Sequence, residues 1–217
     1  MKRAELIYDA KNIVLYTHDD HIGRFHSKGI FYELAMLEFI KEKNYQWLII
    51  DAGANVGNHS VFFGLMTNCT GVMAFEPVKN NYSLLRRNII ENRLENKVFC
   101  HPHGLSHRTM QMAAEEKSDN MGMCRLIEGA GIEVKPLDDC LDKEMPVSMI
   151  KIDCEGMEQK VLGGAMRILK RWQPDLFVEA ATQEGKKSLD AILRPLGYAC
   201  LQMFNATPTW YYSVRKK

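Results

Sequence analysis

The sequence predicts an α/β fold in which one mostly parallel sheet carries helices on both faces. Short apolar runs alternate with amphipathic stretches of helical length between residues 31 and 193. The last two apolar runs, 198–203 and 209–214, are separated by the turn Asn205-Ala-Thr-Pro208. Such a pair is typical of a hairpin, so we expect the last strand to run antiparallel to its neighbours.

The first elements lead into the sheet. Residues 13–16 and 22–25 are predicted to be short strands or an irregular lead-in. Residues 31–43 are predicted to form an amphipathic helix that stops at Asn44, because apolar side chains recur at helical spacing. These side chains are Phe31, Leu34, Leu37 and Ile40.

Strands and helices then alternate. The predicted strands are residues 47–50, 71–75, 98–100, 147–152 and 176–179. The predicted helices are residues 61–66, 80–92, 158–170 and 187–193. Residues 105–135 mix methionine, glycine and charge with weak alternation, so we interpret them as short antiparallel excursions from the sheet.

Three motifs stand where predicted strands end. They are Asp51-Ala-Gly-Ala-Asn-Val-Gly57, Phe75-Glu-Pro77 and Ile150-Lys-Ile-Asp-Cys-Glu-Gly156. Ligands of parallel sheets bind at the carboxyl ends of the strands, so the motifs outline one cleft. The first supplies a tight turn, the second a lone acid suited to a ribose, and the third acids near a reacting centre. This combination predicts a methyltransferase that uses S-adenosylmethionine.

The turn after Asp51 depends on its glycines. Gly53 and Gly57 allow positive φ and close approach of a ligand, and the helix that follows directs free N–H groups toward the cofactor. A dinucleotide fingerprint would need glycines where Asn55 and Asn58 stand. The two missing glycines argue against a nicotinamide-dependent oxidoreductase. A tight turn without any ligand is the alternative structural interpretation.

The acids of the second and third motifs have different expected roles. Glu76 can accept both hydroxyl hydrogens of a ribose, and Pro77 ends the strand behind it. Asp153 and Glu155 could bind the amino group of methionine, orient a hydroxyl or act as a base. Glu158 is better explained by capping of the next helix, because acids favour that end.

The histidines admit two readings. His101, His103 and His107 form H-x-H-x-x-x-H, which is compatible with a metal cluster. No acid or cysteine completes a ligand set, so we expect no metal and assign these residues to loops near the cofactor base. His59 begins the helix after the glycine turn and is a possible base, since imidazole titrates near neutral pH.

Over roughly residues 20–200 the chain resembles the FkbM family of S-adenosylmethionine-dependent methyltransferases. The matching segments are 29–33, 51–57, 74–77, 137–139, 150–156 with Glu158, 162–165 and 174–179. The resemblance implies the class I, Rossmann-like methyltransferase fold, with a seven-stranded sheet whose last strand is antiparallel. It also implies O-methylation of a hydroxyl on a sugar, glycan or small metabolite. A methyltransferase-like binding subunit without catalysis is the remaining alternative.

Site residues follow from these matches. The positions that we assign to the cofactor are Asp51, Gly53, Asn55, Gly57, Asn58, Glu76, Pro77, His103, Gly104 and Asp153. The resemblance implies that the glycine turn lines the methionine end, that Glu76 holds the ribose, and that adenine rests at His103 and Gly104.

The catalytic residues are assigned to the third motif. Asp153 should face the reacting methyl, and we take Asp153 and Glu155 as the catalytic residues. Lys151, Glu179 and His59 follow as further candidate bases. Lys151 is expected on the opposite side of its strand from the neighbours of Asp153.

Bulk properties bound the rest. We expect one domain over residues 1–217, with 1–44 as a lead-in and a helix that covers the cleft and 45–217 as the Rossmann-like core. Lys plus Arg is 28 and Asp plus Glu is 27, so the net charge of +1 favours a small-molecule or glycan acceptor over nucleic acid. The N-terminus lacks a leader pattern, no run is long enough to span a membrane, and the six cysteines are scattered, which indicates a cytoplasmic protein. The sequence leaves the oligomeric state open.

Overall fold

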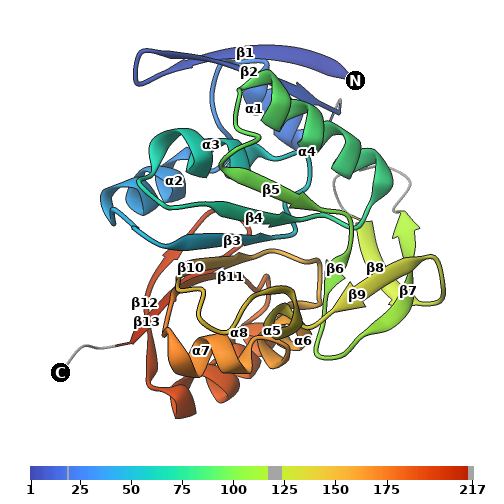
Figure 1. The fold of residues 1–217 in the computed structure, drawn as a ribbon, viewed down its shortest axis with the longest axis vertical. Helices are drawn as coiled ribbons and strands as arrows, with labels where there is room; N and C mark the ends of the chain where they lie inside the picture. Colours follow the sequence, from blue (N-terminus) through green and yellow to red (C-terminus); the bar gives the residue numbers. More distant parts are fainter. Residues whose placement is uncertain (19, 117–123, 215–217) are drawn as a thin grey trace.

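A seven-stranded sheet forms the centre of the computed structural model, which describes residues 1–18, 20–116 and 124–214. The strands lie in the order β12-β13-β11-β10-β3-β4-β5 (Figure 1). Their bounds are β12 Tyr198–Phe204, β13 Thr209–Val214, β11 Asp175–Glu179, β10 Val147–Ile152, β3 Leu48–Ala52, β4 Val72–Phe75 and β5 Val98–His101. Strand β13 runs antiparallel to β11 and β12, and the other neighbours pair in parallel. The predicted fold class, with its antiparallel last strand, is confirmed.

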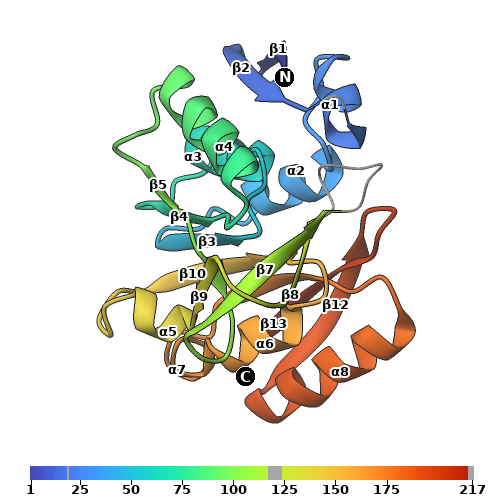
Figure 2. The same ribbon diagram turned by 90° about the vertical axis from the view of Figure 1, so that its right-hand side faces the viewer.

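Helices cover both faces of this sheet (Figure 2). One layer holds α2 (Leu34–Glu42), α3 (Asn58–Met66) and α4 (Lys79–Glu91). The other holds α5 (Leu137–Cys140), α6 (Glu158–Gly163), α7 (Met166–Arg171) and α8 (Gln183–Leu193), which continues into the short 3₁₀ turn η1 (Arg194–Leu196). Ile49 packs into the core of the first layer and Ile50 into that of the second. Burial on both faces explains why these strands are continuous apolar runs.

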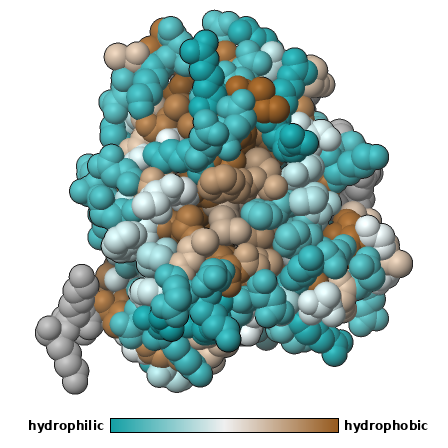
Figure 3. Space-filling model, in the orientation of Figure 1, coloured by the Kyte–Doolittle hydropathy of each residue, from teal (hydrophilic) through white to brown (hydrophobic). Residues whose placement is uncertain are grey.

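The surface agrees with this layering. In Figure 3 hydrophobic residues gather in the middle of the molecule, at the level of the sheet, and hydrophilic ones cover the parts above and below. Among the described residues no helix is both long and apolar enough to cross a membrane. The cysteines at positions 69, 100, 140, 154 and 200 are free thiols.

A second, smaller sheet stands beside the first, on the right of Figure 1. Its order is β6-β9-β7-β8, with β6 Gly104–Leu105, β9 Ile132–Lys135, β7 Met110–Glu116 and β8 Cys124–Glu128. Strand β7 is antiparallel to β8 and β9, as predicted for residues 105–135, whereas β6 pairs in parallel with β9. The part of the predicted excursion at 117–123 lies outside the described residues.

Two predicted elements were wrong in type or extent. Residues 22–25 lie in a helix, α1 (His21–His26), because Asp20 caps it: Asp20 Oδ1 accepts a hydrogen bond of 2.8 Å from the Gly23 N–H. The predicted helix 158–170 is broken between α6 and α7. A Cβ on Gly164 would lie 2.0 Å from the Ser106 carbonyl oxygen, so the backbone there packs directly against the residue after β6.

The lead-in is a two-stranded sheet of β1 (Lys2–Tyr8) and β2 (Lys11–Thr17) that α4 holds through side-chain amides. Asn88 Oδ1 accepts from the Tyr16 N–H at 2.6 Å, and Asn88 Nδ2 donates to the carbonyls of Tyr16 and Val56 at 2.8 and 2.7 Å. The Asn92 amide likewise accepts a hydrogen bond from the Val14 N–H and donates one to the Val14 carbonyl. The amides therefore satisfy the edge of β2 as a further strand would.

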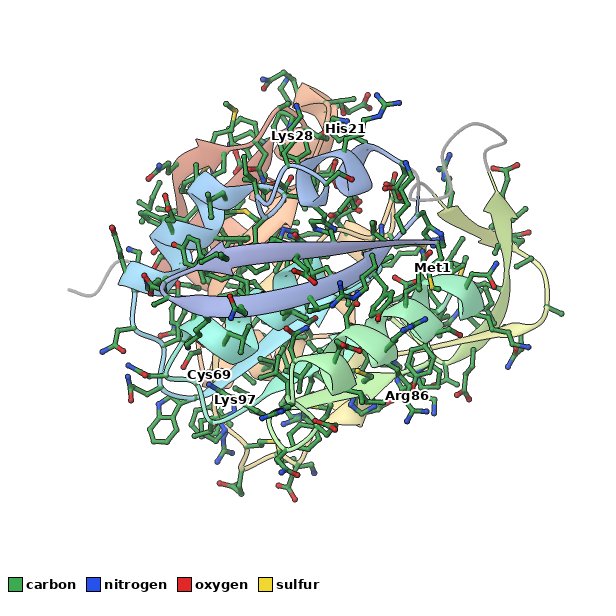
Figure 4. All side chains as sticks on the ribbon, turned by 90° about the horizontal axis from the view of Figure 1, so that it is seen from above. Met1, His21, Lys28, Cys69, Arg86 and Lys97 are labelled. Atoms are coloured by element: carbon green, nitrogen blue, oxygen red, sulfur yellow. The ribbon has the colours of Figure 1, made fainter. Side chains whose placement is uncertain are left out.

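Viewed from above, this hairpin crosses the molecule (Figure 4). Helix α1, which begins at His21 and is followed by Lys28, lies on one side of the hairpin, and α4 with Arg86 lies on the other. The apolar side chains of the hairpin, among them Leu6, Ile13 and Leu15, join the core of the first layer. The lead-in is thus packed onto the sheet domain instead of standing apart from it.

Substitution Asn88→Ala should lower the free energy of unfolding by about 3 kcal/mol, because it leaves the buried N–H and carbonyl of Tyr16 without partners. Urea denaturation followed by circular dichroism measures the change. Asn80→Ala is the matched control, since Asn80 is exposed on the same helix. Equal stability of the two variants would contradict the structural role of Asn88.

Candidate active site

A cleft of about 620 Å³ opens at the carboxyl ends of β3, β4, β10 and β11. The lead-in closes its other side with Asp20, His21, Ile22, Tyr32 and Glu33. The small sheet and the β12–β13 turn complete the rim. The cleft is therefore walled both by the sheet and by a segment that precedes it in the chain.

Most of the predicted site residues meet in this cleft. Those that line it are Gly53, Asn55, Asn58, Glu76, Pro77, Gly104, Asp153 and Glu155. The further candidate bases Lys151, Glu179 and His59 line it as well. Asp51, Gly57 and His103 lie outside the lining.

The glycines of the turn serve the packing of the chain. Gly53 has φ +77°, and a Cβ there would lie 1.7 Å from the Asp153 carbonyl oxygen. Gly57 has φ +92°, and a Cβ there would lie 2.7 Å from Leu85 Cδ1. The space beside Gly53 is therefore taken by the loop after β10, and the expected contact of Gly53 with a ligand stays a prediction.

Glu76 braces the same turn from β4. Its Oε2 accepts from the Asn55 N–H at 2.8 Å, and its Oε1 accepts from the Val78 N–H at 2.9 Å. Burial raises the pKa of Glu76 to about 7 in spite of these two hydrogen bonds. Each carboxylate oxygen keeps a second lone pair, so the side chain can still accept hydrogen bonds from a ligand.

Lys151 lies between the two central strands. Its Nζ is 3.2 Å from Asp51 Oδ1, 3.5 Å from Asp153 Oδ2 and 2.8 Å from the Gly53 carbonyl oxygen. Burial alone would lower the pKa of Lys151, but the carboxylates of Asp51 and Asp153 outweigh it and raise that pKa above its ordinary value. The expectation that Lys151 lies on the opposite side of the strand is wrong, because residues 151 and 153 share one face.

Asp51 is fully buried behind the cleft wall. Besides Lys151 it receives a hydrogen bond of 2.6 Å from Ser60 Oγ on α3. With no exposed surface, Asp51 does not reach a ligand directly. Asp51 forms an ion pair with Lys151, and Lys151 forms a second ion pair with Asp153.

The carboxyls of Asp153 and Glu179, at the ends of β10 and β11, share a hydrogen bond and change each other's pKa. Burial alone would raise the pKa of Asp153, but Lys151 and a hydrogen bond from Glu179 lower it below the usual range. Burial, and then the neighbouring Asp153, raise the pKa of Glu179. Asp153 therefore carries the negative charge of the pair and Glu179 the proton.

The side-chain amide of Asn58 is hydrogen-bonded to the lead-in. Its Oδ1 accepts from the Tyr32 N–H at 3.0 Å, and its Nδ2 donates to the Tyr32 carbonyl at 3.0 Å. The same oxygen lies 2.8 Å from His26 Nε2. Asn58 thus fixes the backbone of Tyr32 and Glu33 beside the cleft, a role that the sequence did not suggest.

The other end of the cleft is apolar. Pro77, Leu105 and Leu126 line it together with Gly104. The ring of His101 stacks on Phe75 at 4.7 Å between centroids, and His103 meets the same ring edge-on at 5.4 Å. Burial lowers the pKa of both histidines, so they are neutral packing groups behind this end of the cleft.

Glu158 supports the loop that carries the catalytic candidates. Its Oε1 accepts from the N–H groups of Cys154 and Gly156, each at 3.0 Å. Both N–H groups precede α6, whose N-cap residue is Met157 without a side-chain cap, so the expected capping role is corrected: Glu158 braces the loop before the helix. Glu155 lies in the same loop with φ +50° and faces the cleft.

Sequence reasoning missed the contribution of Tyr32 and Glu33. Glu33 Oε2 lies 3.1 Å from His59 Nε2, and both side chains are nearly buried. Burial, and then Glu33, raise the pKa of the Tyr32 phenol. The segment 29–33 was noted only as part of a family resemblance, and nothing in its own pattern indicates that it meets α3.

The amino-acid sequence matches the Methyltransferase FkbM domain over residues 51–200. It is 27% identical to Methyltransferase 1 of Beauveria bassiana (strain ARSEF 2860) over 144 residues, covering 54% of this chain and 57% of that protein. The fold is similar to that of methyltransferase FkbM from Methylobacillus flagellatus KT, with a TM-score of 0.58 and 23% identity, covering 77% of this chain and 43% of that chain.

The fold is shared more widely. An rRNA methylase from Streptococcus thermophilus superposes with a TM-score of 0.55 and 14% identity, covering 85% of this chain and 98% of that chain. A precorrin-6y C5,15-methyltransferase from Geobacter metallireducens GS-15 gives 0.52 and 17%, covering 84% and 88%. The chain spans little more than half of the Beauveria protein and less than half of the Methylobacillus chain.

The raised pKa of Glu76 predicts a specific dependence of stability on pH. From about pH 4.5 to about pH 7 the folded carboxyl keeps a proton that the unfolded chain loses. The contribution is therefore fully present below pH 4.5 and is lost as the pH rises toward 7, at no more than about 1.4 kcal/mol per pH unit. Urea denaturation across this window should show a flatter dependence for Glu76→Gln than for the exposed control Glu91→Gln. Parallel curves would contradict the assignment.

Proposed function

The chain belongs to the FkbM methyltransferase family, and from that premise we propose that it transfers a methyl group from S-adenosylmethionine to a hydroxyl oxygen of a sugar, glycan or small metabolite. The observation that carries the proposal is the order of groups along the cleft: an apolar end, the Glu76 carboxylate, and then the acids at Asp153. When bound, S-adenosylmethionine supplies a methyl group on a cationic sulfonium and leaves as a neutral thioether.

The lining fits this cofactor in three places. Pro77, Leu105 and Leu126 offer apolar surface to a flat base. The lone pairs that remain on Glu76 suit two ribose hydroxyls. The methionine end of the cofactor would bind at Gly53 and Asn55, beside the N-terminus of α3. The free N–H groups of that helix end favour the methionine carboxylate.

Asp153 and Glu155 are proposed to act where the methyl group is transferred. Lys151 keeps Asp153 ionised, so its negative charge can lie against a positive sulfonium. The loop is fixed by Glu158 and by the contact between Gly53 and Asp153. A fixed acid beside the donor contributes chiefly by aligning the donor with the acceptor oxygen.

The charge of the cleft supports a neutral acceptor. At the end formed by the lead-in, Glu33 and Glu155 line the cleft together with Asp153, whereas Glu179 carries a proton. Among the described lining residues Lys151 is the one lysine or arginine, and it is engaged with three oxygens. A phosphate would meet uncompensated negative charge there, whereas a hydroxyl can donate to it. We therefore propose that nucleic acid is not the acceptor.

Glu76→Ala should abolish the preference for a ribose with its hydroxyls. Isothermal calorimetry of the wild type above pH 7, where Glu76 is ionised, should show S-adenosylhomocysteine binding more tightly than its 2′-deoxy analogue by about 1.5–3 kcal/mol, the range for a hydrogen bond to a charged group. In Glu76→Ala the two ligands should bind equally, even if the loss of the brace weakens both. An undiminished difference in the variant would place the ribose elsewhere.

A screen with labelled S-adenosylmethionine tests the acceptor class. Methyl glycosides and small polyols should gain label, and their phosphorylated counterparts should not, because the acids around Asp153 repel a second negative charge. An RNA pool is included as a nucleic-acid probe. Label in RNA alone would refute the proposed acceptor class and leave the family assignment intact.

A further inference from the structure

We propose that His59, oriented by Glu33, is the base that accepts the proton of the acceptor hydroxyl. The inference rests on the proposed O-methylation, because a hydroxyl must lose its proton when its oxygen is methylated. His59 would be a catalytic residue that touches the acceptor, and Glu33 a positioning residue that acts through it.

The geometry joins two distant segments. His59 is the second residue of α3, and Glu33 precedes α2 with φ +59°. His59 Nε2 and Glu33 Oε2 are 3.1 Å apart, and the side chains are only 7% and 10% exposed although both line the cleft. The imidazole lies nearly parallel to the Phe63 ring, and Asn58 holds the backbone before Glu33. The pair is therefore fixed before any ligand binds.

This contact favours one tautomer of the imidazole. His59 Nε2 faces a carboxylate oxygen, which has no proton to donate, so a proton on Nε2 is favoured although the two atoms are not aligned as a hydrogen bond. Nδ1 of His59 then keeps its lone pair and can accept a proton. Once it does, the imidazolium is stabilised by Glu33, in the arrangement by which carboxylates orient catalytic histidines.

Four other titratable groups of the cleft are unsuited to the task. Asp153 is a weak base, since Lys151 lowers its pKa. Glu179 carries a proton at neutral pH because its pKa is raised, and so does Lys151. The raised pKa of Tyr32 keeps its phenol protonated. Among the described lining residues, His59 is a histidine whose ring lies against a carboxylate, an arrangement that leaves a nitrogen lone pair to accept a proton.

The charges around His59 favour this role. Glu33 faces it from the start of α2, and Asp153 interacts with it from the end of β10. Tyr32 and Glu179 are uncharged, and Lys151 is balanced by Asp51 and Asp153. From α1, His26 would oppose a charge on His59, but burial lowers the pKa of His26 and keeps it neutral.

The step balances. The acceptor oxygen forms its bond to the methyl carbon, and the carbon–sulfur bond breaks with its electron pair going to sulfur. The hydroxyl proton passes to Nδ1 of His59. The proton then leaves to solvent when the product departs.

Nitrogen-15 NMR of histidine-labelled protein with S-adenosylhomocysteine tests the pair without turnover. In the wild type, His59 should carry its proton on Nε2 when neutral. Glu33→Gln should mix the two neutral tautomers, because a glutamine amide can either accept from Nε2 or donate to it. Glu91→Gln, exposed on α4, should leave the tautomer unchanged. An unchanged tautomer in Glu33→Gln would overturn the proposed orientation.

Kinetics with a pool of methyl glycosides tests the base. His59→Gln should lower kcat by about 100-fold or more, the effect of losing a general base, and leave the affinity for S-adenosylhomocysteine unchanged. Glu33→Gln should lower kcat less, because the base remains but is no longer oriented by a carboxylate. His107→Gln, at an exposed histidine, is the control.

The outcomes separate the two proposals. Weakened binding of S-adenosylhomocysteine with unchanged kcat in His59→Gln would make the histidine a cofactor ligand and overturn its role as a base. If the wild type binds S-adenosylhomocysteine but methylates no glycoside, the proposed acceptor class fails, and the tautomer seen by NMR still decides whether Glu33 orients His59.

Discussion

The buried ammonium of Lys151 is the interaction on which the cleft depends. Register pairs Lys151 with Asp51 across β10 and β3, and the same side chain reaches the Gly53 carbonyl and Asp153. A buried charge left without its partner costs several kcal/mol, so neither strand can shift relative to the other without exposing this network to that penalty. The position and ionisation of the acid that faces the reaction are therefore set by a contact that lies behind the cleft wall.

The second constraint is the set of hydrogen bonds by which asparagine side chains hold the lead-in against the sheet domain. Asn88 joins β2 to the turn after β3, and Asn58 joins the start of α3 to Tyr32. Each amide uses one donor and one acceptor to bind the N–H and carbonyl of a single residue, Tyr16 for Asn88 and Tyr32 for Asn58. The wall of the cleft that carries Glu33 is thereby placed by the same segment that forms the glycine turn, so cofactor end and acceptor end are built around one short stretch of chain.

The sequence was sufficient for the sheet and for the acids at its edge, because polar residues interrupt apolar runs at Asp51, Glu76 and Asp153. It was insufficient where a role depends on a remote partner. Asp51 was assigned to the ligand, yet its partner Lys151 lies on another strand. Asn58 was assigned likewise and lines the cleft, but the bonds of its amide to the lead-in were not foreseen. Helix α1 was predicted as a strand or irregular segment, although its capping signal, Asp20, was present in the sequence.

The amide grip on β2 also constrains the order in which the chain can fold. On the ribosome the hairpin emerges before α4, and the Asn88 and Asn92 contacts to Tyr16 and Val14 span 72 and 78 residues. Until α4 has been synthesised, the core that Leu6, Ile13 and Leu15 enter is incomplete. The nascent hairpin therefore exposes apolar side chains for a long interval, a state that attracts chaperones and favours misassembly. Because one wall of the cleft is held by residues made much later in the chain, the growing chain needs protection until those residues are synthesised.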